Sequence, residues 1–196
     1  MNKYAEDRKF TDLIHRKVAV PKIYDPLGWK EVVRKSDEAN RADLSDGIDY
    51  VFNANGGIVT VQERFRDKKY QSYSDFTIRY RRDGNIHTER HKSEYYKIKA
   101  DYFTYGITNC IKEEFANCTD FIKYAIVDMR KVYSKIESGD IVIKDSRRSR
   151  CIIQSKKIIC PIQYNSDKSS SFFPIEIFYL IKLWDSSIVV AQKGFI

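Results

Sequence analysis

The stretch of sequence that decides the fold runs from residue 47 to residue 66 and reads GIDYVFNANGGIVTVQERFR. Both of its halves are rich in β-branched and aromatic residues, and the polar segment NANGG at 53–57 separates them. Two such runs on either side of a turn that contains Asn and Gly are typical of a β-hairpin. We therefore expect strands at 48–52 and 58–66.

The second strand of this hairpin has two chemically different faces. Because side chains alternate between the faces of a strand, Val61 and Phe65 can enter the core. Gln62 and Arg64 then point outward or into a cleft, with their side chains about 7 Å apart. Asp49, on the first strand, lies opposite them. The hairpin thus brings one acid close to an amide and a cation.

The segments around the hairpin complete an α/β pattern. Apolar residues at helical spacing predict a helix from Ala5 to Val18 that Pro21 stops, and a second helix from Trp29 to Asn40. A strand at 75–81 would follow the hairpin as the third member of an antiparallel meander. The later segments predict a helix at 89–99, strands at 102–107 and 121–127, a helix at 129–137, strands at 151–154 and 158–162, a helix at 174–183, and surface loops at 144–150 and 165–171. We expect one α/β domain spanning 1–196, with a mixed sheet.

The composition favours a compact domain with an anionic partner. The chain has 196 residues, of which 42% are hydrophobic, and this is enough for one core. Its 35 Lys and Arg residues outnumber 27 Asp and Glu, so nucleic acid is the first partner to test, although ordinary solubility charge explains the excess equally well. No apolar run approaches the roughly 20 residues that cross a bilayer. The first residues lack the apolar stretch of a signal peptide, so we expect a cytoplasmic protein without membrane association.

Several other chemistries lack their sequence signatures. The three histidines accompany no GxSxG nucleophile, and neither GxGxxG nor GxxxxGK[ST] occurs, so triad hydrolysis, dinucleotide binding and phosphate-loop chemistry have no support. The four cysteines have no CxxC spacing, which argues against structural zinc. We expect them to be reduced, small apolar residues: Cys110, Cys118, Cys151 and Cys160.

The residues around Asp49 and Gln62 resemble a known nuclease pattern. Gly47-Ile48-Asp49, followed after a loop by Val61-Gln62-Glu63-Arg64, resembles the GxD … VQxK pattern of the PD-(D/E)XK nuclease superfamily, in the form of Mrr-like restriction enzymes and Holliday-junction resolvases. The expected element order is also similar to the αβββαβ core of that superfamily. Residues 48–108, about a third of the chain, carry the resemblance. It implies a restriction-endonuclease-like core with a mixed central sheet flanked by helices.

The resemblance assigns catalytic roles to Asp49, Gln62 and Arg64. Asp49 resembles the metal-binding aspartate, Gln62 a variant of the second acidic position, and Arg64 the catalytic lysine. Mg²⁺, for which Mn²⁺ could substitute, would take hard oxygen ligands from Asp49 and from Gln62 or Glu63. Gln in place of an acid removes one negative ligand, and Arg, with a pKa above about 12, cannot act as a base. Catalytic competence is therefore a separate question from the fold.

Many members of the superfamily place a further acid on the helix before the first core strand. Glu38 is the candidate metal ligand here, with Glu6 and Asp37 as competitors. A solvated helix face explains Glu38 at least as well. Glu63 has an alternative too, because an inward or edge residue could pair with a neighbouring arginine.

Basic residues surround the proposed site and could neutralise several phosphates. Ion pairs with nearby aspartates are the alternative explanation for them. Tyr70 and Tyr73 could stack on exposed bases, whereas we expect Phe76 and Tyr80 to belong to the core. The candidate nucleic-acid-binding residues are Arg66, Lys68, Lys69, Arg79 and Arg81, and a second basic stretch holds Arg147, Arg148, Arg150, Lys156 and Lys157.

Taken together, the sequence predicts a Mg²⁺-dependent endonuclease that hydrolyses the phosphodiester bonds of DNA. Such a chain would suit a restriction system, a phage or another mobile element, and a homodimer would be compatible with it. Two alternatives stay open. The first is a catalytically inactive nucleic-acid-binding module with the same fold, and the second is a protein-interaction subunit whose basic charge is incidental.

Overall fold

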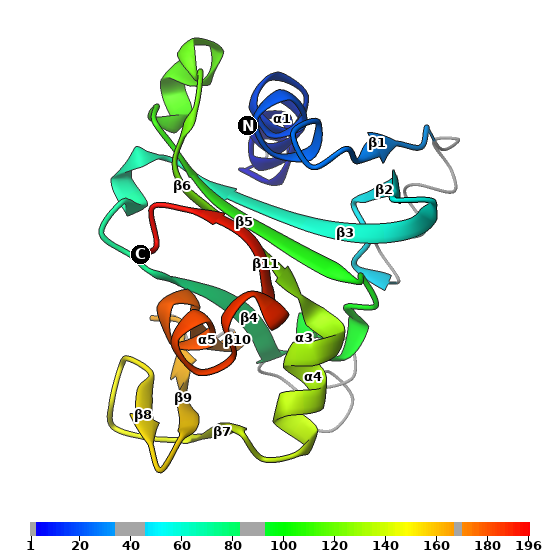
Figure 1. Ribbon diagram of the computed structural model, residues 1–196. Helices are drawn as coiled ribbons and strands as arrows, with labels where there is room; N and C mark the ends of the chain where they lie inside the picture. Colours follow the sequence, from blue (N-terminus) through cyan, green and yellow to red (C-terminus); the bar gives the residue numbers. More distant parts are fainter. Residues whose placement is uncertain (1–2, 34–45, 83–92, 167–169) are drawn as a thin grey trace.

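The computed structural model describes residues 3–33, 46–82, 93–166 and 170–196, and it has a mixed α/β architecture with two sheets (Figure 1). A six-stranded sheet has the order β1-β2-β3-β5-β6-β11. Its strands are β1 (Lys30–Glu31), β2 (Tyr50–Ala54), β3 (Gly57–Arg66), β5 (Tyr102–Thr108), β6 (Phe121–Asp128) and β11 (Val189–Lys193). In this sheet β3 is parallel to β5, and the other pairs are antiparallel.

The second sheet has the order β4-β10-β9-β7, and β8 pairs with β9 beside this path. Its strands are β4 (Asp75–Arg82), β10 (Ser170–Glu176), β9 (Lys157–Tyr164), β7 (Ile141–Asp145) and β8 (Ile152–Gln154). The helices are α1 (Lys3–Ile14), a π-helical continuation η1 (His15–Tyr24), α3 (Glu94–Lys97), α4 (Met129–Glu137) and α5 (Ile177–Trp184), with short 3₁₀ turns η2 (Lys68–Tyr70), η4 (Lys112–Asn117) and η5 (Asp185–Ser187).

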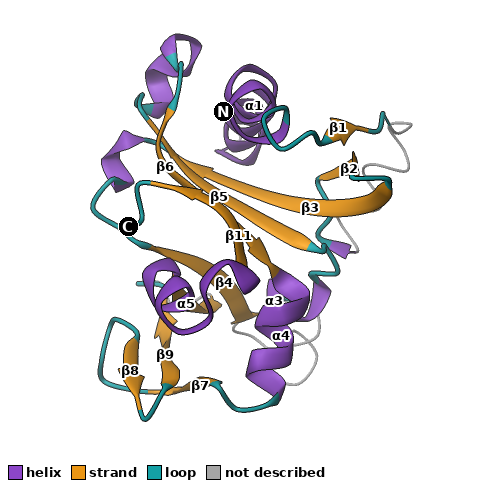
Figure 2. Cartoon of the chain, viewed as in Figure 1, coloured by secondary structure: helices purple, strands orange, loops and turns teal. Residues whose placement is uncertain are grey.

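The six-stranded sheet is covered on both faces, and each face has its own apolar core (Figure 2). On one face, Phe52, Val61 and Phe65 pack with residues of α1 and η1 such as Ile14. On the other, Phe103 belongs to a larger core that includes residues of β4, β10, α4 and α5. The polar residues of β3 that alternate with Val61 and Phe65 therefore face the second sheet.

The predicted hairpin is confirmed. Tyr50 pairs with Val61 and Ala54 with Gly57, which leaves Asn55 and Gly56 as a two-residue turn. Both turn residues have positive φ, 53° and 85°, as the hairpin turns that match the twist of the strands require. Asn and Gly adopt this conformation most readily, so the local sequence determined the turn.

The expected three-stranded meander is wrong. A strand forms at Asp75–Arg82, but it pairs with β10 in the second sheet, and the edge of β3 that was assigned to it pairs with β5. The reason lies in residues 67–74, which follow β3 and include η2. The side chain of Asp67 accepts a hydrogen bond from the backbone N–H of Lys69 and so caps this turn. The chain thereby leaves the plane of the first sheet, where a tight hairpin would have kept it.

The N-terminal predictions need two corrections. The helical backbone continues past Pro21 to Tyr24, because residues 15–24 form the wider π-helix, in which the N–H of Asp25 still bonds to the carbonyl oxygen of Val20. The helix expected from Trp29 is not formed at its start, since Lys30 and Glu31 belong to β1. The rest of that prediction, residues 34–40, lies outside the described residues.

The C-terminal predictions are mixed. The helix at Met129–Glu137 is confirmed, with Asp128 as its N-cap and Gly139 in the left-handed region just beyond its end. The helix expected at 174–183 begins at Ile177, because Pro174 belongs to β10. The loop expected at 165–171 ends early, and Ser170 and Ser171 are buried strand residues.

Candidate nucleic-acid interface

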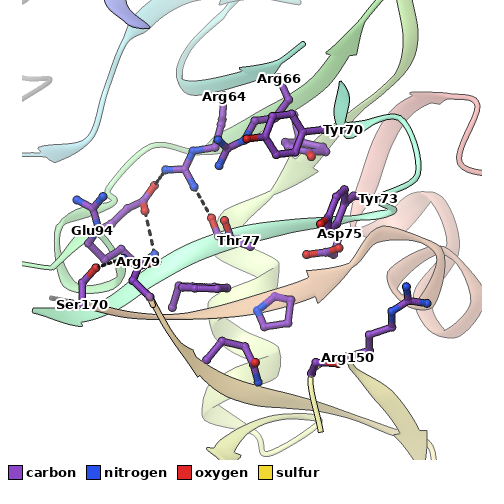
Figure 3. A pocket seen from close by; sticks show the side chains of 16 residues that line it. Arg64, Arg66, Tyr70, Tyr73, Asp75, Thr77, Arg79, Glu94, Arg150 and Ser170 are labelled. Atoms are coloured by element: carbon purple, nitrogen blue, oxygen red, sulfur yellow. Dashed lines mark hydrogen bonds and ion pairs between the residues drawn. The ribbon is translucent and has the colours of Figure 1, made fainter. Parts of the chain in front are cut away.

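A cleft of about 700 Å³ lies between the two sheets (Figure 3). Side chains from both sheets and from the connection between β3 and β4 form its walls. Four arginines face two carboxylates in this lining, and two tyrosines stand at one end of it. The residues that carry the argument are Arg64, Arg66, Arg79, Arg150, Asp75, Glu94, Tyr70 and Tyr73. A concave surface with an excess of arginine suits an anion that carries several negative charges.

Glu94 organises one wall of the cleft, and the sequence reading missed it. It begins the short helix α3, and its Oε1 accepts hydrogen bonds from the Arg64 guanidinium and from Gln62 Nε2, the latter at 3.3 Å. Its Oε2 accepts from the backbone N–H of Arg79 at 2.9 Å. Arg64 also donates to the carbonyl oxygen of Thr77 and lies over the ring of Phe103. These contacts fix the direction of Arg64 before any ligand arrives.

Asp49 lies beside Gln62, as the hairpin predicted. Its backbone N–H donates to the carbonyl oxygen of Val61 at 3.0 Å, and its Oδ2 accepts from the backbone N–H of Glu63 at 2.8 Å. These two bonds hold Asp49 against the residues on either side of Gln62, namely Val61 and Glu63. Arg64 lines the cleft, whereas Asp49 and Gln62 are not among the lining residues. Asp49 therefore lies just before β2 and beside Gln62 of β3, and of the predicted trio only Arg64 reaches the cavity wall.

Glu63 points to the face of the sheet opposite to that of Gln62. It therefore does not point toward a metal site shared with Gln62, which the sequence suggested. Its carboxylate is fully buried, accepts from Tyr24 Oη at 2.6 Å and lies 2.9 Å from His15 Nδ1. His15 Nε2 lies 3.3 Å from Glu31 Oε2. Burial opposes the charged imidazolium, but the carboxylates of Glu63 and Glu31 outweigh it and raise the pKa of His15. The partner of Glu63 is thus a histidine, where the sequence suggested an arginine.

The remaining metal-ligand candidates give little support. Glu38 and Asp37 lie outside the described residues, and the side chain of Glu6 is not described either. Within the described ranges, no group of three or more His, Cys, Asp or Glu side chains is arranged to hold a metal ion. One buried oxygen beside Asp49 lacks a partner within the described part of the chain. The side-chain oxygen of Gln62, Oε1, is buried and has no hydrogen-bond partner among the described residues.

The predicted phosphate-binding residues fall into three groups, apart from Lys156, in the turn between β8 and β9, and Lys157, the first residue of β9. Arg66 and Arg79 line the cleft, and so does Arg150 from the second basic stretch. Lys68 and Lys69 are exposed on η2, outside the lining, and Lys69 pairs with Glu113. The remaining three predicted arginines surround a second, smaller hollow, because Arg147 and Arg148 line it and Arg81 bonds to the lining residue Tyr164.

Two titratable groups in the cleft have shifted pKa values. Burial, reinforced by the neighbouring carboxylate of Glu176, raises the pKa of Asp75 above its usual range. The nearby arginines Arg150 and Arg66 oppose this shift. Burial also raises the pKa of the Tyr105 phenol to about 12.

The core predictions and the cysteine prediction are confirmed. Phe76 is fully buried, and Tyr80 packs against the same core. All four cysteines are free and buried, and the sulfur atoms of Cys151 and Cys160 lie 3.7 Å apart. Among the described helices, none is both long and apolar enough to cross a membrane. No family model, no curated protein and no solved structure matches the chain.

Proposed function

We propose that this protein is a metal-dependent DNA endonuclease that binds DNA phosphates in the arginine-lined cleft and hydrolyses a phosphodiester bond at the corner formed by Asp49, Gln62 and Arg64. The observation that carries the proposal is the convergence of four arginines, from strands of both sheets and the loop before β8, on one cavity beside that corner. The resemblance of residues 47–64 to the PD-(D/E)XK pattern supports the same reading. The restriction-endonuclease-like core is part of this proposal.

Binding is the better supported half of the proposal. Arginine presents a planar fork of donors that matches phosphate oxygens, and it keeps its charge at every physiological pH. Arg79 is exposed to solvent, and Arg64 is held by Glu94 and Thr77. Arg64 is pre-oriented, which lowers the entropy that would be lost when it binds a phosphate.

Two oxygens at this corner, the Asp49 carboxylate and the amide oxygen of Gln62, are hard ligands of the kind that Mg²⁺ takes. Mg²⁺ in proteins typically keeps several waters and takes one or two protein carboxylates together with substrate phosphate oxygens. Asp49 would supply the carboxylate, and Gln62 would supply its unpartnered Oε1. A cation bound there would polarise the phosphate and lower the pKa of a coordinated water.

The residues of the chain have separate roles in such a reaction. Arg64 cannot accept a proton, so its role is to orient the phosphate and to stabilise the negative charge that develops on it. Glu94 positions Arg64 through their ion pair and positions Gln62 through a hydrogen bond. Asp49 is held in place by the backbone N–H of Glu63.

A cleavage assay tests the proposal. Plasmid, linear, single-stranded and branched DNA are incubated with the protein in Mg²⁺, in Mn²⁺ and in EDTA, with an Asp49→Ala protein purified in parallel to reveal contaminating nuclease. We expect cleavage of at least one form that needs the metal and that Asp49→Ala lacks. Absence of cleavage in every condition would contradict the catalytic half of the proposal.

A second candidate is a module of the same fold that binds nucleic acid without cleaving it. One specific observation favours it: Gln62 donates its amide hydrogen to Glu94, and Arg64 pairs with the same carboxylate. The two residues that depart from the nuclease pattern therefore both have a structural contact, which a catalytic role is not needed to explain. Titration calorimetry with Mn²⁺ separates the two candidates. Heat of binding in wild type that disappears in Asp49→Ala supports the nuclease, and no metal binding together with salt-sensitive DNA binding supports the module. A protein-interaction subunit would show neither.

A further inference from the structure

Two exposed tyrosines stand at the mouth of the cleft. Tyr70 and Tyr73 keep 42% and 54% of their surface in solvent, and their ring centroids lie 5.9 Å apart (Figure 3). Both are held by the turn after β3, where the N–H of Tyr73 donates to the carbonyl oxygen of Tyr70 at 3.0 Å. The guanidinium of Arg66 lies over the Tyr70 ring, 5.3 Å from its centroid. We call Tyr70 and Tyr73 the tyrosine rim.

The same combination of groups recurs at the second hollow. There the ring of Tyr164, 46% exposed, lies under the guanidinium of Arg81 at 5.6 Å. Gln163 lines both the cleft and this hollow, so the two cavities adjoin. Arg147 and Arg148 line the far one. Each of the two adjoining cavities thus combines an arginine-covered tyrosine with further cationic side chains.

This arrangement of exposed aromatic rings and arginines suits an unpaired strand better than a duplex. Aromatic side chains bind bases by stacking, and a base can stack on protein only when it has left its own stack. The cleft, at about 700 Å³, is within the range of cavities that hold one small ligand, so it can take a nucleotide or two but not a duplex. Its walls also carry polar side chains that can reach base edges, namely those of Gln163, Asn165 and Ser170.

We infer that the cleft binds an unpaired stretch of DNA, with bases on the tyrosine rim and phosphates on Arg66, Arg79 and Arg150. This inference rests on the proposed function, because it names the form of DNA that the same site takes. The substrate is then a single strand, or a duplex region in which a few bases have been opened. Fully paired duplex DNA would contact only arginines at the rim of the cleft and would not reach the tyrosine rim by stacking.

Fluorescence anisotropy in EDTA, which prevents cleavage, tests this inference. The probes are a DNA single strand of about 12 nucleotides, a length within the usual site sizes of strand-binding proteins, its fully paired duplex, and a longer duplex with an internal bubble. We expect the single strand and the bubble to bind at least about tenfold more tightly than the duplex. Tyr70→Ala/Tyr73→Ala should weaken single-strand binding about tenfold and leave duplex binding unchanged.

The conservative variant Tyr70→Phe/Tyr73→Phe is the matched control, since it keeps both rings. It should bind the single strand within about twofold of wild type, as stacking requires. Both variants change exposed residues, and circular dichroism verifies that they fold. Equal or tighter binding of the duplex, or an Ala variant that binds the single strand like wild type, would overturn the inference while leaving DNA binding intact. If the wild-type protein shows no salt-sensitive binding to any of the three probes, the proposed function itself would be overturned.

Discussion

Each face of β3 carries an ionisable residue with an ionisable partner, but the surroundings of the two residues differ. On one face, the Glu63 carboxylate is fully buried between His15 and Tyr24. On the other, the Arg64 side chain keeps 25% of its surface exposed and ends in the cleft. Glu63 pairs with a histidine whose pKa it raises, and Arg64 pairs with the carboxylate of Glu94. Only the second has room beside it for a ligand.

The comparison shows that burial separates a structural charge from a candidate functional one. A buried ion pair is costly to break because the remaining partner is left without solvent. In a partly exposed pair at a cavity wall, the arginine can exchange its carboxylate partner for a phosphate. The account therefore predicts that substitutions on the Glu63 face change stability, and that substitutions on the Arg64 face change binding or cleavage.

The largest expected effect is that of Asp49→Ala on cleavage. In the proposed mechanism this carboxylate is the charged metal ligand, so activity should fall below detection in single-turnover assays when it is removed. DNA binding should stay the same or improve, because a negative charge near the phosphates is lost. Unchanged cleavage by a folded Asp49→Ala protein would exclude this residue as an essential ligand.

Glu63→Ala should produce the largest loss of stability. It removes the buried partner of His15 and the acceptor of the Tyr24 hydroxyl, and breaking a buried charged pair costs about 3–5 kcal/mol. Urea denaturation measures the change, with Gln62→Ala as the neighbour on the opposite face. That control should lose no more than about 1–2 kcal/mol, the range of one hydrogen bond. Equal losses would mean that the two faces do not differ as described.

Arg64 should show the opposite profile, a strong effect on cleavage and a weak one on folding. Arg64→Ala should slow cleavage by about 2–4 kcal/mol, if its loss resembles that of an oxyanion-stabilising donor. Arg64→Lys keeps the charge and should retain measurable activity. Affinity for DNA should fall less than the rate, because other arginines contact phosphates. A rate for Arg64→Ala equal to that of wild type would reduce Arg64 to a positioning role.

Asp75→Asn should have the smallest effect, and the direction of the change in stability and in DNA affinity is what tests the account. Burial raises the pKa of Asp75, so the folded state binds its proton more tightly than the unfolded state. The resulting loss of stability grows as the pH rises from the unfolded to the folded pKa and is complete above the folded pKa. The amide removes this penalty and one negative charge from the cleft. At neutral pH we expect a slightly more stable protein that binds DNA about two- to threefold more tightly. Weaker binding would show that Asp75 itself contacts the ligand.

Local sequence predicted what local forces determine. The hairpin turn at Asn55 and Gly56 and the capped helix α4 follow from residues next to each other in the chain. The pairing partner of β4 depends on β10, almost a hundred residues later, and no local signal specifies it. The role of Glu94 likewise depends on how α3 docks against β3 and β4. The sequence placed Glu94 inside the helix predicted at 89–99, but it specified neither the start of the helix at Glu94 nor the partners of this acid.

The central claim is that the cleft is the surface that binds phosphates, and the salt dependence of DNA affinity tests it most directly. The dissociation constant for a single strand is measured over a range of salt for wild type, for Arg79→Ala/Arg150→Ala in the cleft, and for Arg16→Ala/Lys17→Ala. The last pair removes the same charge from exposed positions on η1, across the six-stranded sheet. The cleft variant should bind more weakly, with a logarithmic salt slope about 1.4 lower than that of wild type, while the η1 variant keeps the wild-type slope. Equal slopes for wild type and the cleft variant, or a larger decrease in the η1 variant, would contradict the account.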